Sequence, residues 1–139
     1  MFFQAPGGFM EYATLVILLA LAQYIYFLTK VGLYRGKAHI QAPACDGDEG
    51  FERLFRVQQN TLEQLIIFIP ALYFFAVYVN PVWGAMLGSI YVIGRFVYAA
   101  AYFRNPADRG PGMLMTLIPN CLLVAGAIAG IVLKIIQYE

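Results

Sequence analysis

Charge is scarce in this chain of 139 residues. Asp, Glu, Lys and Arg together make up 12% of it, whereas a soluble globular domain carries about 25%. Hydrophobic residues reach 61%, above the roughly 45–50% of such domains. The net charge of +1 offers no basic excess for nucleic acid, and no nucleic-acid-binding motif is present. The composition therefore predicts one compact membrane domain over residues 1–139 and no nucleic-acid partner.

Cysteine and histidine are almost absent. Cys45 lies in a polar segment and Cys121 in an apolar one. Their different depths argue against a disulfide, so we interpret both as free thiols without a catalytic role. His39 is the only histidine, and we interpret it as a solvated loop residue rather than a catalytic base. We expect no metal site.

Long uncharged runs are abundant instead. Residues 12–29, 64–94 and 110–133 form uncharged runs of 18, 31 and 24 residues. A spanning helix needs about 20 mainly apolar residues, and Asn80-Pro81 marks a turn inside the longest run. We predict an all-α integral membrane four-helix bundle, because backbone groups in lipid must bond within their own segment. The predicted helices cover about residues 9–34, 56–79, 82–103 and 111–136.

The Lys and Arg residues are unevenly distributed between the two ends of these helices. Five lie in the segment 30–56 and two in the segment 104–109, and Lys134 is the only one near the opposite ends. Lys and Arg are enriched in cytoplasmic loops. We therefore expect the first and third loops in the cytoplasm and both termini on the other side. A bacterial inner membrane and the endoplasmic reticulum both fit this topology.

The densest polar cluster lies at the start of the second predicted helix, in FERLFRVQQNTLEQLIIF (51–68). At about 100° per residue, five polar side chains share one stripe of the helix, with mostly apolar residues on the other faces. The stripe is a hydrogen-bonding face on a helix that enters the membrane. Its members are Glu52, Arg56, Gln59, Asn60 and Glu63.

A second polar stripe lies on the third predicted helix, where Tyr91, Arg95, Tyr98 and Tyr102 recur at spacings of four, three and four. Polar groups at membrane depth are costly and usually functional. Arginines bind carboxylates, a glutamate binds an ammonium, and amides bind peptide groups. The two stripes together predict a site for a small zwitterionic, peptide-like molecule. The alternative is internal neutralisation, in which Glu52, Arg56 and Glu63 pair with Arg53 and Arg95.

The stretch FERLFRVQQNTLEQ resembles the signature of the MAPEG family, the membrane-associated proteins of eicosanoid and glutathione metabolism. The resemblance extends to VGLYRGKAHIQAPA at the end of the first helix and to GRFVYAAAYFRNPADRG in the third. It implies a left-handed four-helix bundle that forms a homotrimer. It also implies glutathione as co-substrate, bound between neighbouring subunits near the cytoplasmic face.

Site residues follow from this resemblance position by position. It implies that Arg109 faces the glutathione thiol and that Arg35 lies near the thiol or the second substrate. Arg95 would be a structural or ligand-contacting charge. The other implied glutathione-binding residues are Arg56, Gln58, Asn60, Glu63, Tyr98 and Tyr102.

Four positions depart from specialised branches of the family. Gln64 replaces a tyrosine, Gly36 a second arginine, and Thr61 and Gly110 an aspartate and a serine. The resemblance therefore implies a general glutathione transferase acting on apolar electrophiles from membrane lipid, with a glutathione-dependent peroxidase side activity. Two alternatives stay open: a non-catalytic lipid-binding scaffold of the same family, and a small transporter or structural membrane protein.

Overall fold

The computed structural model describes residues 9–139, so residues 1–8 of the predicted domain lie outside the described part. Four long helices follow one another along the chain, and the described residues contain no strand. The predicted all-α architecture of four apolar helices is confirmed. The elements are α1 (Met10–Lys37), α2 (Glu49–Tyr78), α3 (Pro81–Arg104), the short 3-10 helix η1 (Pro106–Arg109) and α4 (Gly110–Gln137).

Side-chain caps determine where three of these elements begin. The Asp48 carboxylate accepts a hydrogen bond from the Phe51 N–H at 2.9 Å, and the Asn80 and Asn105 side chains cap α3 and η1 in the same way. Such caps satisfy N–H groups that have no partner inside the helix. The α2 helix consequently begins at Glu49 rather than at about residue 56, because hydropathy marks entry into the membrane and not the first helical residue.

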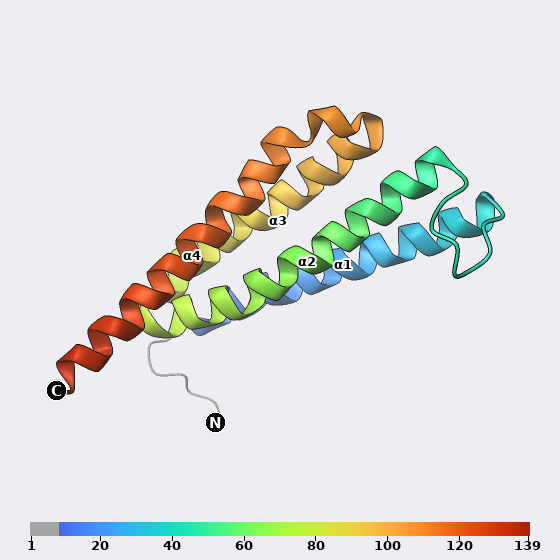
Figure 1. Cartoon of the computed structure of the whole chain (residues 1–139). Helices are drawn as coiled ribbons and strands as arrows, with labels where there is room; N and C mark the ends of the chain where they lie inside the picture. Colours follow the sequence, from blue (N-terminus) through green and yellow to red (C-terminus); the bar gives the residue numbers. More distant parts are fainter. Residues whose placement is uncertain (1–8) are drawn as a thin grey trace, which may run out of the picture.

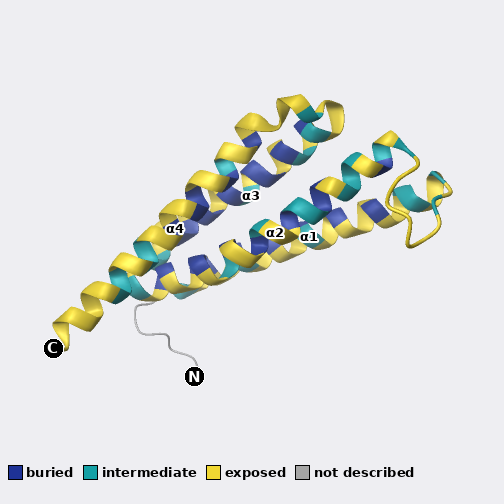
Figure 2. Ribbon diagram, in the orientation of Figure 1, coloured by how far each residue is buried: buried dark blue, intermediate teal, exposed yellow. Residues whose placement is uncertain are grey.

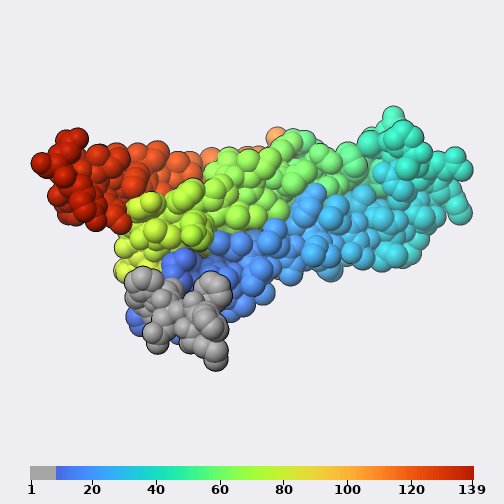
Figure 3. Space-filling model, turned by 90° about the horizontal axis from the view of Figure 1, so that it is seen from below, coloured from blue at the N-terminus to red at the C-terminus, as the bar shows by residue number. Residues whose placement is uncertain are grey.

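The helices form two pairs, α1 with α2 and α3 with α4 (Figure 1). The pairs diverge toward the end of the molecule that carries the α1–α2 loop and η1, and the C-terminus lies at the opposite end (Figure 1). Both α2 and α3 pack against the three other helices. Seen from below, α1 and α2 lie side by side along one face (Figure 3).

The pairs approach most closely where small residues allow it. The rings of Phe68 and Tyr91 stack with centroids 3.8 Å apart. A Cβ on Gly88 would lie 2.7 Å from Val16 Cγ1, and one on Gly94 would lie 2.5 Å from Met115 Cβ. Glycine at these positions therefore lets α3 approach both α1 and α4.

The outward faces of the helices are apolar. Exposed residues cover the outside of the bundle, and buried ones line the space between helices (Figure 2). Large side chains such as Leu33, Ile66 and Trp83 are 66%, 69% and 61% exposed. An apolar surface of this extent is unsuited to water, and all four helices are long and apolar enough to cross a bilayer.

Candidate functional site

The polar stripe of α2 faces out of the single chain. Arg56 and Glu63 form an ion pair at 3.6 Å, and their side chains are 52% and 56% exposed. Glu52 is also exposed, and Gln59 and Asn60 are half-buried. An exposed ion pair of this kind contributes little to stability. These charged groups therefore remain accessible to a ligand.

The opposite face of α2 contacts α3. Arg95 Nη2 donates a hydrogen bond to Thr61 Oγ1 at 2.7 Å, and both residues are buried, at 1% and 0% exposure. Thr61 lies about 180° around the helix from Glu52. Within the described residues Arg95 forms no ion pair. Arg95 therefore does not neutralise the α2 stripe, as one alternative from the sequence had suggested.

The α3 stripe forms a continuous aromatic column around this arginine. The Arg95 guanidinium lies 4.3 Å from the centroid of the Tyr98 ring, and the Tyr98 and Tyr102 rings stack at 5.5 Å. Tyr98 is also within electrostatic range of Arg56 on α2 and Arg109 on η1. Residues from α2 and η1 are therefore both within electrostatic range of the α3 stripe.

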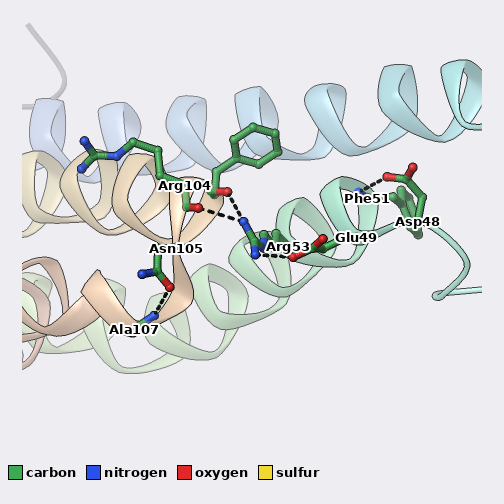
Figure 4. A network of polar contacts seen from close by, with 8 residues as sticks. Asp48, Glu49, Phe51, Arg53, Arg104, Asn105 and Ala107 are labelled. Atoms are coloured by element: carbon green, nitrogen blue, oxygen red, sulfur yellow. Dashed lines mark hydrogen bonds and ion pairs between the residues drawn. The ribbon is translucent and has the colours of Figure 1, made fainter.

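A clamp that the sequence did not reveal joins α2 to the end of α3, just before the turn that carries Arg109. Arg53 Nη1 donates to the carbonyl oxygens of Phe103 and Arg104, both at 2.9 Å, and its Nη2 pairs with Glu49 (Figure 4). The last carbonyls of a helix have no partner within the helix, so Arg53 joins the start of α2 to the end of α3. Arg109 itself is exposed and has no ion-pair partner among residues 9–139.

Arg35 and Gln58 lie on a different side of the chain. Arg35 Nη1 donates to the Ala44 carbonyl at 2.7 Å, and its guanidinium lies 4.7 Å from the Phe51 ring centroid. Gln58 is buried and donates to the Tyr24 hydroxyl of α1 at 2.8 Å. Since Gln58 lies about 160° around α2 from Arg56, one chain does not bring these two residues together.

Further polar contacts tie the helices together at membrane depth. Asn120 Nδ2 of α4 donates to Gln64 Oε1 of α2 at 3.0 Å, and Gln23 Nε2 of α1 donates to the Val92 carbonyl of α3 at 2.8 Å. Hydrogen bonds of this type join helices in lipid. Gln64, noted above only for replacing a tyrosine, thus has a structural partner, and the single asparagine of α4 was the available sequence signal.

Metal-binding groups are not a feature of this site. Among residues 9–139 there is no group of three or more His, Cys, Asp or Glu side chains that could hold a metal ion. Cys45 and Cys121 are both free thiols.

A comparison with protein families shows which family this chain matches. The model of the MAPEG family matches residues 12–129, most of the sequence. This chain belongs to the MAPEG family. Among MAPEG relatives, microsomal glutathione S-transferase 2 of Mus musculus is 38% identical over 116 residues, covering 84% of this chain and 79% of the relative.

Two further relatives match most of this MAPEG chain. An uncharacterized protein of Synechocystis sp. is 38% identical over 123 residues, covering 88% of this chain and 90% of the relative. Leukotriene C4 synthase of Rattus norvegicus is 29% identical over 116 residues, covering 84% and 77%. Family membership and the four apolar helices together identify an integral membrane protein.

Proposed function

We propose that this MAPEG protein is a membrane glutathione transferase that activates the glutathione thiol and joins it to hydrophobic electrophiles. The observation that carries the proposal is the exposed Arg56–Glu63 pair, whose two opposite charges remain accessible to a ligand. The likeness to proteins named microsomal glutathione S-transferase 2 supports the choice of thiol.

The charges of the α2 stripe complement those of glutathione. The Arg56 guanidinium suits a carboxylate, the Glu63 carboxylate suits the ammonium group, and the Asn60 amide suits a peptide bond. In the free protein Arg56 and Glu63 bind each other only through an exposed contact of 3.6 Å. Because such a contact is worth little, the two ends of the ligand replace it at small cost.

The chemistry requires a thiolate. A cysteine-type thiol has a pKa of about 8.5, so only a small fraction is ionised near pH 7. A guanidinium beside the sulfur favours the anion, and lowering the thiol pKa by about 1.5 units requires about 2 kcal/mol. We assign this role to Arg109, whose charge is not neutralised by a carboxylate among the described residues. Tyr98 and Tyr102 supply phenolic donors beside it.

In the transferase reaction the thiol proton leaves to solvent and the sulfur attacks the electrophilic carbon. With an aryl halide the S–C bond forms as the C–halogen bond breaks, and halide leaves with the bonding electrons. The same thiolate attacks a lipid hydroperoxide at oxygen, releasing the alcohol and forming a sulfenic acid that a second glutathione converts to the disulfide. We include this peroxidase reaction as a side activity.

The site extends across a subunit boundary in this proposal. Arg35 and Gln58 lie on the α1–α2 side, away from the Arg56 stripe. They approach a glutathione only if that side of one subunit faces the stripe of another, as in a homotrimer. The α1–α2 loop and η1 lie at the same end of the bundle (Figure 1), and we assign this end to the cytoplasm, where glutathione is available.

The decisive test mixes the purified detergent-solubilised protein with glutathione near neutral pH and follows thiolate absorbance and proton release in a stopped-flow instrument. We expect a thiolate signal for the wild type and little for Arg109→Ala. Lys134→Ala is the matched control, because it removes one positive charge near the other end of α4. A thiolate signal in Arg109→Ala equal to wild type would exclude the assigned role. Absence of glutathione binding in calorimetry would instead identify the non-catalytic scaffold.

A further inference from the structure

A groove with a volume of about 530 Å³ opens on the α1–α3 side of the bundle. Its α1 wall is a stripe of residues spaced three and four apart, from Tyr26 to Lys37. The α2 and α3 walls are mainly apolar, with Leu54, Val57 and Phe96 among them. The volume falls in the range of sites that bind small molecules.

The groove is distinct from the glutathione site proposed above. Arg56, Asn60, Glu63, Tyr98 and Arg109 are not among the residues that line it. The two regions lie back to back, since the Tyr98 ring packs in one buried cluster with Phe27 and Val57, two residues of the groove wall.

All charged residues that line the groove are basic. Lys30 and Lys37 come from the end of α1 and Arg104 from the end of α3. Within the described residues none of the three forms an ion pair. The acidic group Asp48 acts on the Tyr34 hydroxyl at one edge of the groove.

The end of α3 does not account for the position of Arg104. Basic residues in the last turn of a helix interact favourably with its free carbonyls, but the carbonyls of Phe103 and Arg104 already accept from Arg53. The Arg104 side chain instead extends away from Arg53 toward the α1 ribbon (Figure 4). Its guanidinium is therefore free to bind an anion at the groove.

We propose that the groove binds one anionic phospholipid of the surrounding bilayer, with its phosphate between Lys30, Lys37 and Arg104 and an acyl chain along the apolar walls. Basic pockets between membrane helices bind anionic head groups. The lipid would lie against residues of α1, α2 and α3 that line the groove. The binding of this lipid does not depend on glutathione chemistry.

The test uses delipidated protein in a neutral detergent and compares added phosphatidylglycerol with phosphatidylcholine of the same chains. We expect phosphatidylglycerol to raise the midpoint of thermal unfolding by about 4 °C or more beyond phosphatidylcholine. Native mass spectrometry should show one retained phosphatidylglycerol per chain. Equal shifts with the two lipids, or the same shift with inorganic phosphate alone, would overturn the proposal.

Two kinds of variant locate the effect. The triple variant Lys30→Gln, Lys37→Gln and Arg104→Gln should lose the preference for phosphatidylglycerol. Ala100→Phe keeps every charge but fills the groove, and it should lose the preference too, whereas Ala129→Phe on the exposed face of α4 should keep it. If the triple variant does not fold, Ala100→Phe decides alone. A preference that survives in Ala100→Phe contradicts the proposal. Crosslinking of the variant Ala100→Cys to a second copy through position 100 would contradict it as well.

Discussion

The two regions at the diverging end of the bundle use similar side chains for different purposes. On the α2 side, arginines stand with a carboxylate, an amide and tyrosine hydroxyls. On the α1–α3 side, three cations stand above apolar walls. A mixture of signs suits a zwitterion, whereas cations over an apolar cavity suit an anionic amphiphile. Tyr98 lies between the regions, because its ring packs with Phe27 and Val57 of the groove wall and it is within electrostatic range of Arg56 and Arg109.

The largest effect is expected from Arg109→Ala, which acts on the α2 side alone. Loss of about 2 kcal/mol of thiolate stabilisation should lower kcat for an aryl halide roughly 15-fold at pH 7, because a thiol pKa that moves from about 7 to about 8.5 lowers the thiolate fraction from about one half to about 3%. The pH at half-maximal rate should move about 1.5 units upward, because the thiol must ionise without the guanidinium. Steady-state kinetics between pH 6 and 9 measure both changes. A reduced rate with an unshifted pH profile would contradict thiolate stabilisation and leave only a positional role.

The second prediction concerns Arg53, which both regions share. Arg53→Met removes two hydrogen bonds to the end of α3 and the pair with Glu49. We expect a loss of about 1.5 kcal/mol in stability, a lower kcat, and a smaller phosphatidylglycerol shift, because Arg109 and Arg104 both flank the clamp. Glu49→Gln removes the ion pair and keeps the carbonyl contacts, so it should have little effect in thermal unfolding. Equal losses in the two variants would argue against the clamp.

Glu63→Gln should separate binding from chemistry. Removing the partner of the glutathione ammonium should raise KM for glutathione about tenfold, which corresponds to about 1.4 kcal/mol, with kcat within about twofold. Glu52→Gln on the same exposed stripe controls for the loss of one negative charge. Initial rates measured at increasing glutathione concentrations give KM and kcat for both variants. An unchanged KM would remove Glu63 from the proposed ligands.

The smallest effect is expected from Lys37→Gln on the other side. Loss of one of three cations should cost about 1 kcal/mol of anionic-lipid binding. Retention of phosphatidylglycerol in native mass spectrometry should fall accordingly, while glutathione turnover in neutral detergent stays at the wild-type rate. A matching fall in turnover would show that the two regions are coupled through the cluster that contains Tyr98.

Helix content was predictable because it depends on local properties. Long uncharged runs and the turn at Asn80 indicated four helices, and residues 9–139 contain four long ones. The stripe from Glu52 to Glu63 was also predictable, since helical periodicity alone places those residues on one face. Periodicity does not reveal which face packs inward. The face with Thr61 was not recognised as the one that meets Arg95.

The contacts that link distant segments were less accessible to sequence reasoning. Arg53 binds carbonyls about fifty positions away, and any exposed arginine has the same local appearance. Gln58 was grouped with Arg56 by the family resemblance, although the single chain buries it against Tyr24. In both cases the partner is chosen by how the helices cross.

The amino-acid sequence by itself determined a membrane-spanning, all-α protein and the polar face of α2, because composition and periodicity act over short distances. Only the tertiary structure decided that this face points outward, that Arg53 clamps the turn before Arg109, and that three cations meet over an apolar groove. These features depend on the divergence of the two helix pairs, which follows from packing between residues far apart in the chain.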